Sequence, residues 1–262
     1  MPVPNSQALE VASHESQGSP AQEAVGAEIL DARLQRNRDT DEHFSAQASA
    51  ALIAGLARAV QARHDMGVVQ VALHPSVVVL HEGHAPVLLD AGPEHAQQPV
   101  LSSGRDAAGG DSACVTARYT APEQARGAAP SVRGDVYSLG AMLYELLGHR
   151  PPRSRGNAAE VLRAARTHPL PPLRSTSRAL PKSLRHVVER ATSFRAARRY
   201  ASPAELAEDL EACVAGTAVS ARPAGLVERL DNSCLRHRRA WILLGAVLLV
   251  GAAVWVLSRL TS

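Results

Sequence analysis

The chain has 262 residues, with 28 Lys and Arg against 25 Asp and Glu, which gives a formal net charge of +3. This length allows one domain with tails, and the small positive excess, gathered near the C-terminal end, favours contact with anionic lipid over contact with nucleic acid. The three cysteines (Cys114, Cys213 and Cys234) match neither a disulfide pattern nor a metal-ligand pattern, so we expect a reducing compartment and no metal site.

The N-terminal quarter contains a polar arm and two helical segments. Residues 1–25 are rich in Ser, Gln, Glu, Ala and Pro without an apolar period, and are predicted to be disordered. A short helix is expected around residues 29–34. A longer helix is predicted over residues 45–63, where Leu and Val recur at a spacing of four residues.

A hairpin and a long loop follow. The runs 77–80 and 87–89 are rich in Val and Leu, and the polar residues 81–84 between them predict a tight connection. His81 and His84 flank this connection, and we interpret them as turn residues in preference to zinc ligands. Residues 92–115 are rich in Gly, Ser and Ala, and are expected to form a loop of functional or mobile character.

Three helices are predicted in the second half of the domain. The segment from Asp135 is apolar nearly all round, which indicates a buried central helix that ends at Gly148 before two prolines. An amphipathic helix is expected over residues 184–191. The last helix should begin at Ser202, because Ser, Pro and Glu stand at the cap, first and third positions.

An uncharged apolar run occupies residues 240–257. At about 1.5 Å per residue it reaches roughly 27 Å, close to the thickness of the bilayer's hydrocarbon core. The basic cluster 236–239 precedes it, so the positive-inside bias predicts a single span with the N-terminal part in the cytoplasm. Residues 215–239 would be a basic juxtamembrane linker, and residues 258–262 a short tail.

Four motifs in this order resemble one family. They are Leu89-Asp90-Ala91-Gly92, the run from Thr116 to Glu123 (TARYTAPE), the run from Gly134 to Gly140 (GDVYSLG), and Arg198-Arg199-Tyr200. Together they look like the C-terminal lobe of a Ser/Thr protein kinase, of the kind that bacteria carry on membrane-anchored chains. The resemblance implies a mainly α fold with a small β-hairpin over residues 26–214.

The resemblance also implies structural roles for three charged residues. Glu123 would pair with Arg199 in a buried carboxylate–guanidinium bridge, which is costly to break by removing one partner. Asp135 would accept backbone N–H groups of the catalytic loop. Ser112 and Thr116 would lie in the region of the activation loop, where another kinase could phosphorylate them.

The same resemblance places non-catalytic residues where the chemistry should be. With Leu73 and Pro75 fixing the frame, the catalytic base falls on Ala72, the phosphate-facing lysine on His74 and the metal-binding Asn on Val77. A methyl group cannot deprotonate a hydroxyl, and an isopropyl group cannot bind Mg²⁺. Asp90 is retained as a weak candidate for a metal or nucleotide contact.

The nucleotide-covering N-terminal lobe is also expected to be missing. Residues 1–25 are short and polar, they form no phosphate-binding glycine loop, and the chain has no lysine before Lys182. We therefore expect no cofactor and no catalytic residue.

Three functions remain open at this stage. The first is a membrane-anchored pseudokinase that docks a protein partner, such as a true kinase or its substrate, on the face left open by the missing lobe, where Val71, Val77 and Leu80 would present apolar surface. The second is an active Ser/Thr protein kinase that uses Asp90 and Mg-ATP. The third is a decaying gene product without a selected function.

Overall fold

The structure is a computed structural model. It describes residues 27–40, 42–69, 72–81, 83, 85–89, 110–153, 156–173 and 180–222.

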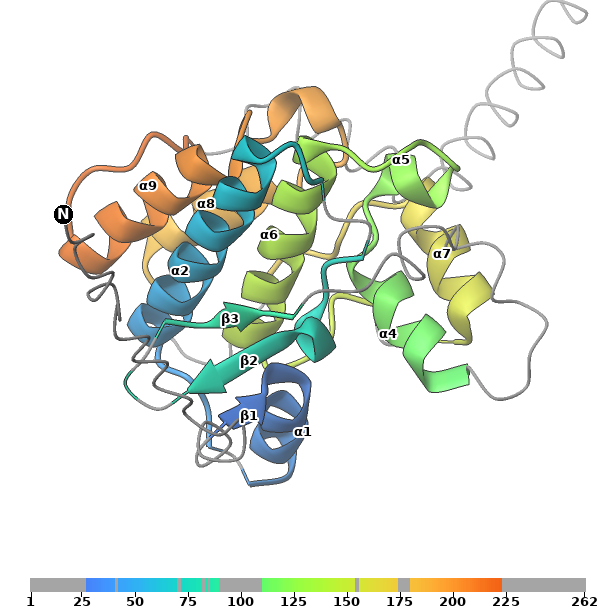
Figure 1. Cartoon of the computed structure of the whole chain (residues 1–262), viewed down its shortest axis with the longest axis horizontal. Helices are drawn as coiled ribbons and strands as arrows, with labels where there is room; N and C mark the ends of the chain where they lie inside the picture. Colours follow the sequence, from blue (N-terminus) through green and yellow to red (C-terminus); the bar gives the residue numbers. More distant parts are fainter. Residues whose placement is uncertain are drawn as a thin grey trace, which may run out of the picture.

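A three-stranded antiparallel sheet with strand order β1-β2-β3 lies in the lower part of the view in Figure 1. The expected hairpin is confirmed: β2 is Val78–His81, β3 is Val87–Leu88, and Val79 lies opposite Val87. The third strand, β1 (Ala27–Ile29), was not expected, because it pairs with β2 across some fifty residues of sequence, which no local pattern reveals.

Helices α1 and α2 precede the hairpin. The short helix expected around residues 29–34 is wrong at its start and too short, since residue 29 is in β1 and α1 runs over Leu30–Thr40. The longer helix is confirmed as α2, Ala46–Asp65. Its N-cap is Ser45, whose Oγ accepts the Ala48 N–H at 3.0 Å.

The buried central helix is confirmed as α6, Val132–Gly148. It begins three residues before Asp135, because Ser131 is the N-cap and its Oγ accepts the Gly134 N–H at 3.1 Å. The residue after it, His149, has φ +55° and closes the helix in the left-handed conformation that glycine more often provides.

The remaining helices both confirm and correct the sequence analysis. The two predicted helices are present as α8 (Lys182–Ala191) and α9 (Pro203–Ala215). The loop predicted over residues 92–115 is wrong at its end, because α4 (Gly110–Tyr119) is helical there. Two helices were missed, α5 (Pro122–Ala125) and α7 (Ala158–Thr167).

The core is built around α2 and α6, which lie side by side in Figure 1. Helix α9 packs on α2, α8 packs on α6, and α7 packs on α4 and α5. Helices α6 and α8 approach so closely that a Cβ at Gly140 would lie 2.6 Å from the Cβ of Ala191, so this crossing requires a glycine. The sheet packs on α2 through β3, and α1 packs on β1 and β2.

No helix within the described residues is long and apolar enough to cross a bilayer. The predicted span, residues 240–257, lies outside the described residues, as do the predicted disordered arm and most of the predicted juxtamembrane linker.

Candidate functional site

The candidate site is the segment between α2 and β2. Helix α2 ends at Asp65, and the N–H of Gly67, which has φ +79°, donates to the His64 carbonyl at 2.8 Å. Residues 70 and 71 lie outside the described residues. The chain then forms a single 3₁₀ turn, η1 (Pro75–Val77), and enters β2 directly.

Apolar packing holds this segment at Leu73 and Pro75, the two residues on which its alignment with the family motif rests. Leu73 is 4% exposed and Pro75 is buried. Val77 is partly buried against the hydrophobic core, and its carbonyl accepts the Leu89 N–H at 2.8 Å, which extends the pairing of β2 and β3. The side chain of Val77 therefore helps to anchor the hairpin.

The same segment has no carboxylate between residues 72 and 77. Ala72 is partly exposed and has only a methyl group. Buried His74 supplies an imidazole and Ser76 a hydroxyl. The resemblance would assign the general base to Ala72 and the Mg²⁺ ligand to Val77, and neither of these two side chains can act as a base or as a hard oxygen ligand.

A buried pair connects the start of this segment to α6. His64 Nε2 lies 2.6 Å from Oδ2 of Asp135, and the side chains are 6% and 2% exposed. A carboxylate at this distance requires Nε2–H as the donor. Asp135 was expected to accept N–H groups of the catalytic loop; the structure adds His64 as a partner that the sequence analysis did not identify.

Glu123 and Arg199 are brought together as the resemblance implied. The guanidinium forms two parallel bonds to the carboxylate, at 2.6 Å through Nη1 and 2.8 Å through Nη2. The Arg199 side chain is fully buried, whereas that of Glu123 is 23% exposed. Arg199 also donates to the carbonyls of Ser193 and Arg133 and lies over the ring of Tyr137, so the pair links α5, α6 and the chain before α9.

The other predicted site residues are Asp90, Ser112 and Thr116. Asp90 lies outside the described residues. Ser112 is in α4, and its side chain is not described. Thr116 is in α4 as well, where its carbonyl accepts the Thr120 hydroxyl at 2.9 Å, so it belongs to a helix and not to a loop. Phosphorylation of either residue remains a prediction.

Metal ligands do not cluster in the part of the chain that the structure describes: no group of three or more His, Cys, Asp or Glu residues could hold an ion there. Of the hairpin histidines, His81 ends β2, and His84 lies outside the described residues.

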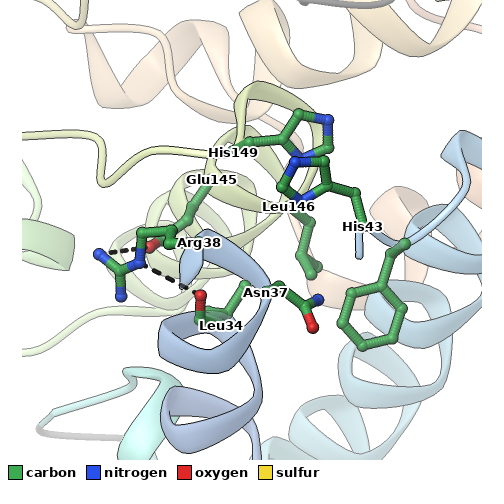
Figure 2. A pocket seen from close by; sticks show the side chains of 8 residues that line it. Leu34, Asn37, Arg38, His43, Glu145, Leu146 and His149 are labelled. Atoms are coloured by element: carbon green, nitrogen blue, oxygen red, sulfur yellow. Dashed lines mark hydrogen bonds and ion pairs between the residues drawn. The ribbon is translucent and has the colours of Figure 1, made fainter. Parts of the chain in front are cut away.

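A buried acidic group that the sequence analysis missed lies at the end of α6. The Tyr119 hydroxyl donates to Glu145, and Arg38 of α1 lies 3.9 Å from the same carboxylate. Figure 2 shows Arg38 beside Glu145, near the stacked rings of His43 and His149. Burial raises the pKa of the Glu145 carboxyl, with the Tyr119 hydrogen bond and Arg38 acting in the opposite direction.

One face of the sheet is apolar and exposed. Ile29 lies opposite Val79, which lies opposite Val87, so the three side chains form a row on one face. Leu89 follows on the same face, two residues after Val87. Ile29, Val87 and Leu89 are 43%, 48% and 42% exposed. We call these four residues the outer sheet face.

The outer sheet face differs from the apolar surface expected from the sequence. Val77 and Leu80 are partly buried and pack against the core, and Val71 lies outside the described residues. Met66 and Val68, just after α2, are exposed instead.

Comparison with known proteins identifies the class to which this fold and these motifs belong. The family described as protein kinase domain matches residues 9–209, which is more than half of the chain, and the chain therefore belongs to that family. The match begins within the predicted N-terminal arm.

The named relatives are serine/threonine-protein kinases. A probable serine/threonine-protein kinase of Corynebacterium efficiens is 30% identical over 196 residues, covering 73% of this chain and 29% of the relative. The serine/threonine-protein kinase PknB of Mycolicibacterium smegmatis is 30% identical over 172 residues, covering 65% of this chain and 27% of the relative. The PknB of Mycobacterium leprae is 30% identical, with coverage of 75% and 30%. The chain thus spans less than a third of the length of these relatives.

Proposed function

We propose that the chain is a pseudokinase: a kinase-fold module without phosphotransfer activity, held at the cytoplasmic face of a membrane, where it docks a protein of Ser/Thr kinase signalling. The observation that carries this proposal is the composition of the segment between α2 and β2. By the resemblance, Ala72 and Val77 would take the positions of the base and the metal ligand of an active kinase, and the buried residues Leu73 and Pro75 lie between them in the chain.

Two largely buried side-chain pairs support a docking role, which depends on the shape of the domain and not on catalytic groups. The pair of His64 with Asp135 joins α2 to α6, and the pair of Glu123 with Arg199 joins α5 to the chain before α9. A general base alone contributes about 10²–10⁴-fold to a rate, so its loss removes most catalysis while leaving the fold intact.

The outer sheet face is the surface we assign to docking. Its exposed aliphatic side chains lie together on one face of a sheet, whereas single exposed apolar residues would need no explanation. The proposed occupant is a second protein, either an active Ser/Thr kinase or a substrate of one. The span at residues 240–257 would hold both at the same membrane.

Photo-crosslinking tests the docking role. Benzoylphenylalanine in place of Val87, in the full chain in its native membrane, should give a crosslinked product that contains a Ser/Thr kinase or a protein that such a kinase phosphorylates. The same group in place of Arg185, an exposed residue on α8, is the matched control. The product should disappear in the Leu89→Asp variant. Equal products from both positions, or a product that Leu89→Asp leaves unchanged, would contradict this surface.

A further inference from the structure

A cavity of about 510 Å³ lies between the end of α6, helix α7 and the two loops that flank α7. Five prolines from these loops, the ring of Tyr144 on α6, and Val161 and Ala164 on α7 provide most of its walls. It shares no residue with the segment between α2 and β2 or with the outer sheet face. Its volume falls within the range of about 300–1,000 Å³ that is typical of small-molecule sites.

The polar side chains that line the cavity are basic, apart from the hydroxyl of Tyr144. Arg150 is exposed at its edge, Arg153 is only 9% exposed, and His168 lies on the opposite loop. None of the described residues that line the cavity is acidic. A guanidinium remains charged at any physiological pH, so the cavity carries a fixed positive charge.

Arg153 has a donor that the described residues do not satisfy. Its Nη2 donates to the carbonyl of His168 at 2.9 Å, which joins the two loops across the end of α7. Its Nε–H is buried and has no hydrogen-bond acceptor. Buried donors are nearly always paired in proteins, and a guanidinium presents its N–H groups in a planar fork that fits a carboxylate.

We propose that this cavity binds an organic anion, a carboxylate attached to an apolar body. The carboxylate accepts from Arg153 and pairs with Arg150, and the apolar body packs on the prolines and Tyr144. A water molecule or an inorganic ion would leave the apolar walls unfilled, whereas a neutral apolar compound would leave the Arg153 Nε–H without an acceptor.

Ligand-observed ¹⁹F NMR tests this site with the full chain in lipid nanodiscs. The probe is 3-(4-fluorophenyl)propionate, and its primary amide is the matched neutral control. The carboxylate resonance should broaden in the presence of the protein and not with empty nanodiscs, while the amide resonance should not. Equal broadening of the two compounds, or no broadening of either, would overturn the proposal.

Three variants test whether the fluorinated acid binds in this cavity. Ala164→Trp should abolish the broadening, because the new ring fills the space beside Val161. Arg150→Gln should weaken binding about tenfold, which corresponds to one lost charge-assisted contact. Arg163→Gln changes an exposed α7 residue that does not line the cavity and should have no effect. Undiminished binding by Arg150→Gln would contradict the proposal even if Ala164→Trp failed to fold.

The carboxylate could belong to a free small acid or to a protein side chain. A synthetic peptide of residues 5–13, which carries Glu10 between Leu9 and Val11, is the second probe. Displacement of the fluorinated acid by this peptide, but not by its Glu10→Gln form, would assign the chemistry to a peptide. Binding of the fluorinated acid without displacement would assign it to a free acid.

Discussion

His64 Nε2 and Asp135 Oδ2 lie 2.6 Å apart, and both side chains are almost completely buried. The contact joins the last turn of α2 to the first turn of α6, and the chain leaves α2 immediately afterwards for the segment that contains Ala72. The segment carries Ala72 and Val77, which under our proposal replace the base and the metal ligand of an active kinase.

Removing one partner of the bridge between Glu123 and Arg199 should be strongly destabilising. Glu123→Gln keeps the shape of the side chain but leaves the fully buried guanidinium of Arg199 without a counter-charge. We expect a loss of about 3 kcal/mol in the free energy of unfolding, measured by urea denaturation.

A matched pair on the surface provides the control for that measurement. Arg58 and Glu211 also form a bidentate contact, through Nε at 2.9 Å and Nη2 at 2.8 Å, but their side chains are 46% and 49% exposed. Glu211→Gln should therefore cost less than about 1 kcal/mol. Equal losses for the two Glu→Gln variants would show that burial does not determine the strength of the bridge.

The elements that sequence could and could not predict differ in the range of the interactions that form them. The helices α2, α6, α8 and α9 carry their own apolar patterns, three of them (α2, α6 and α9) also have a Ser N-cap, and all four were predicted. Strand β1 has three residues and exists through its pairing with β2, so no local pattern identified it. Helix α7 was missed although Asn157 and Glu160 form a capping box at its start, a signal that the sequence contained.

In the candidate site, too, contacts that depend on tertiary packing were not predicted. The family resemblance implied the partnership of Glu123 and Arg199. The carbonyl partners of Arg199 and the pairing of His64 with Asp135 depend on how α2, α6 and the loops pack, and the sequence analysis did not identify them.

Glu145 should make stability depend on pH. Its ordinary pKa is 4.5, and burial raises the pKa in the folded protein. The folded state therefore binds more protons between the two pKa values, so the contribution of Glu145 is most favourable below the unfolded pKa and decreases as pH rises through the folded pKa. Relative to wild type, Glu145→Gln should become progressively more stable as pH rises above 4.5 in a series of urea titrations.

A control with the opposite sign is available at Glu211. The hydrogen bond from Arg58 lowers the pKa of this carboxyl, so its contribution is present above the unfolded pKa and is lost as pH falls through the folded pKa. Glu211→Gln should therefore lose its disadvantage relative to wild type as pH falls. A pH-independent difference between wild type and Glu145→Gln would contradict the assignment of Glu145.

Asp209 should fix the point at which the chain leaves the domain. Its carboxylate accepts the N–H groups of Ser220 and Ala221 at 2.6 and 2.9 Å, and the hydroxyl of Tyr200 at 2.7 Å. An amide in Asp209→Asn cannot accept from all of these donors. Hydrogen exchange at residues 220 and 221 should accelerate in this variant, whereas Leu210 within α9 should keep its protection.

Tyr200→Phe separates this effect from a general loss of stability. It removes the hydroxyl that donates a hydrogen bond to Asp209, which should lower the free energy of unfolding by about 1.5–3 kcal/mol. The hydrogen bonds from the backbone N–H groups of residues 220 and 221 remain in place. Exchange at residues 220 and 221 should then follow global unfolding. Identical exchange patterns in the two variants would argue against a specific anchoring role for Asp209.

The proposed span can be disrupted by charge. Leu248→Arg together with Leu249→Arg places two guanidinium groups near the middle of the run 240–257, at a cost of about 2.5–3.5 kcal/mol each. The doubly substituted chain should move from the carbonate-washed membrane pellet to the supernatant. Ser258→Arg, just beyond the run, should stay in the pellet, and retention of the double variant would contradict the anchor.

Phosphate transfer from labelled ATP tests the central claim most directly. The full chain in nanodiscs would be incubated with Mg²⁺, γ-labelled ATP and a basic protein acceptor, beside the Asp90→Asn variant. We predict that neither protein transfers label to itself or to the acceptor above the level of empty nanodiscs. Label transfer by the wild-type chain that is lost in Asp90→Asn would show an active kinase and contradict this account.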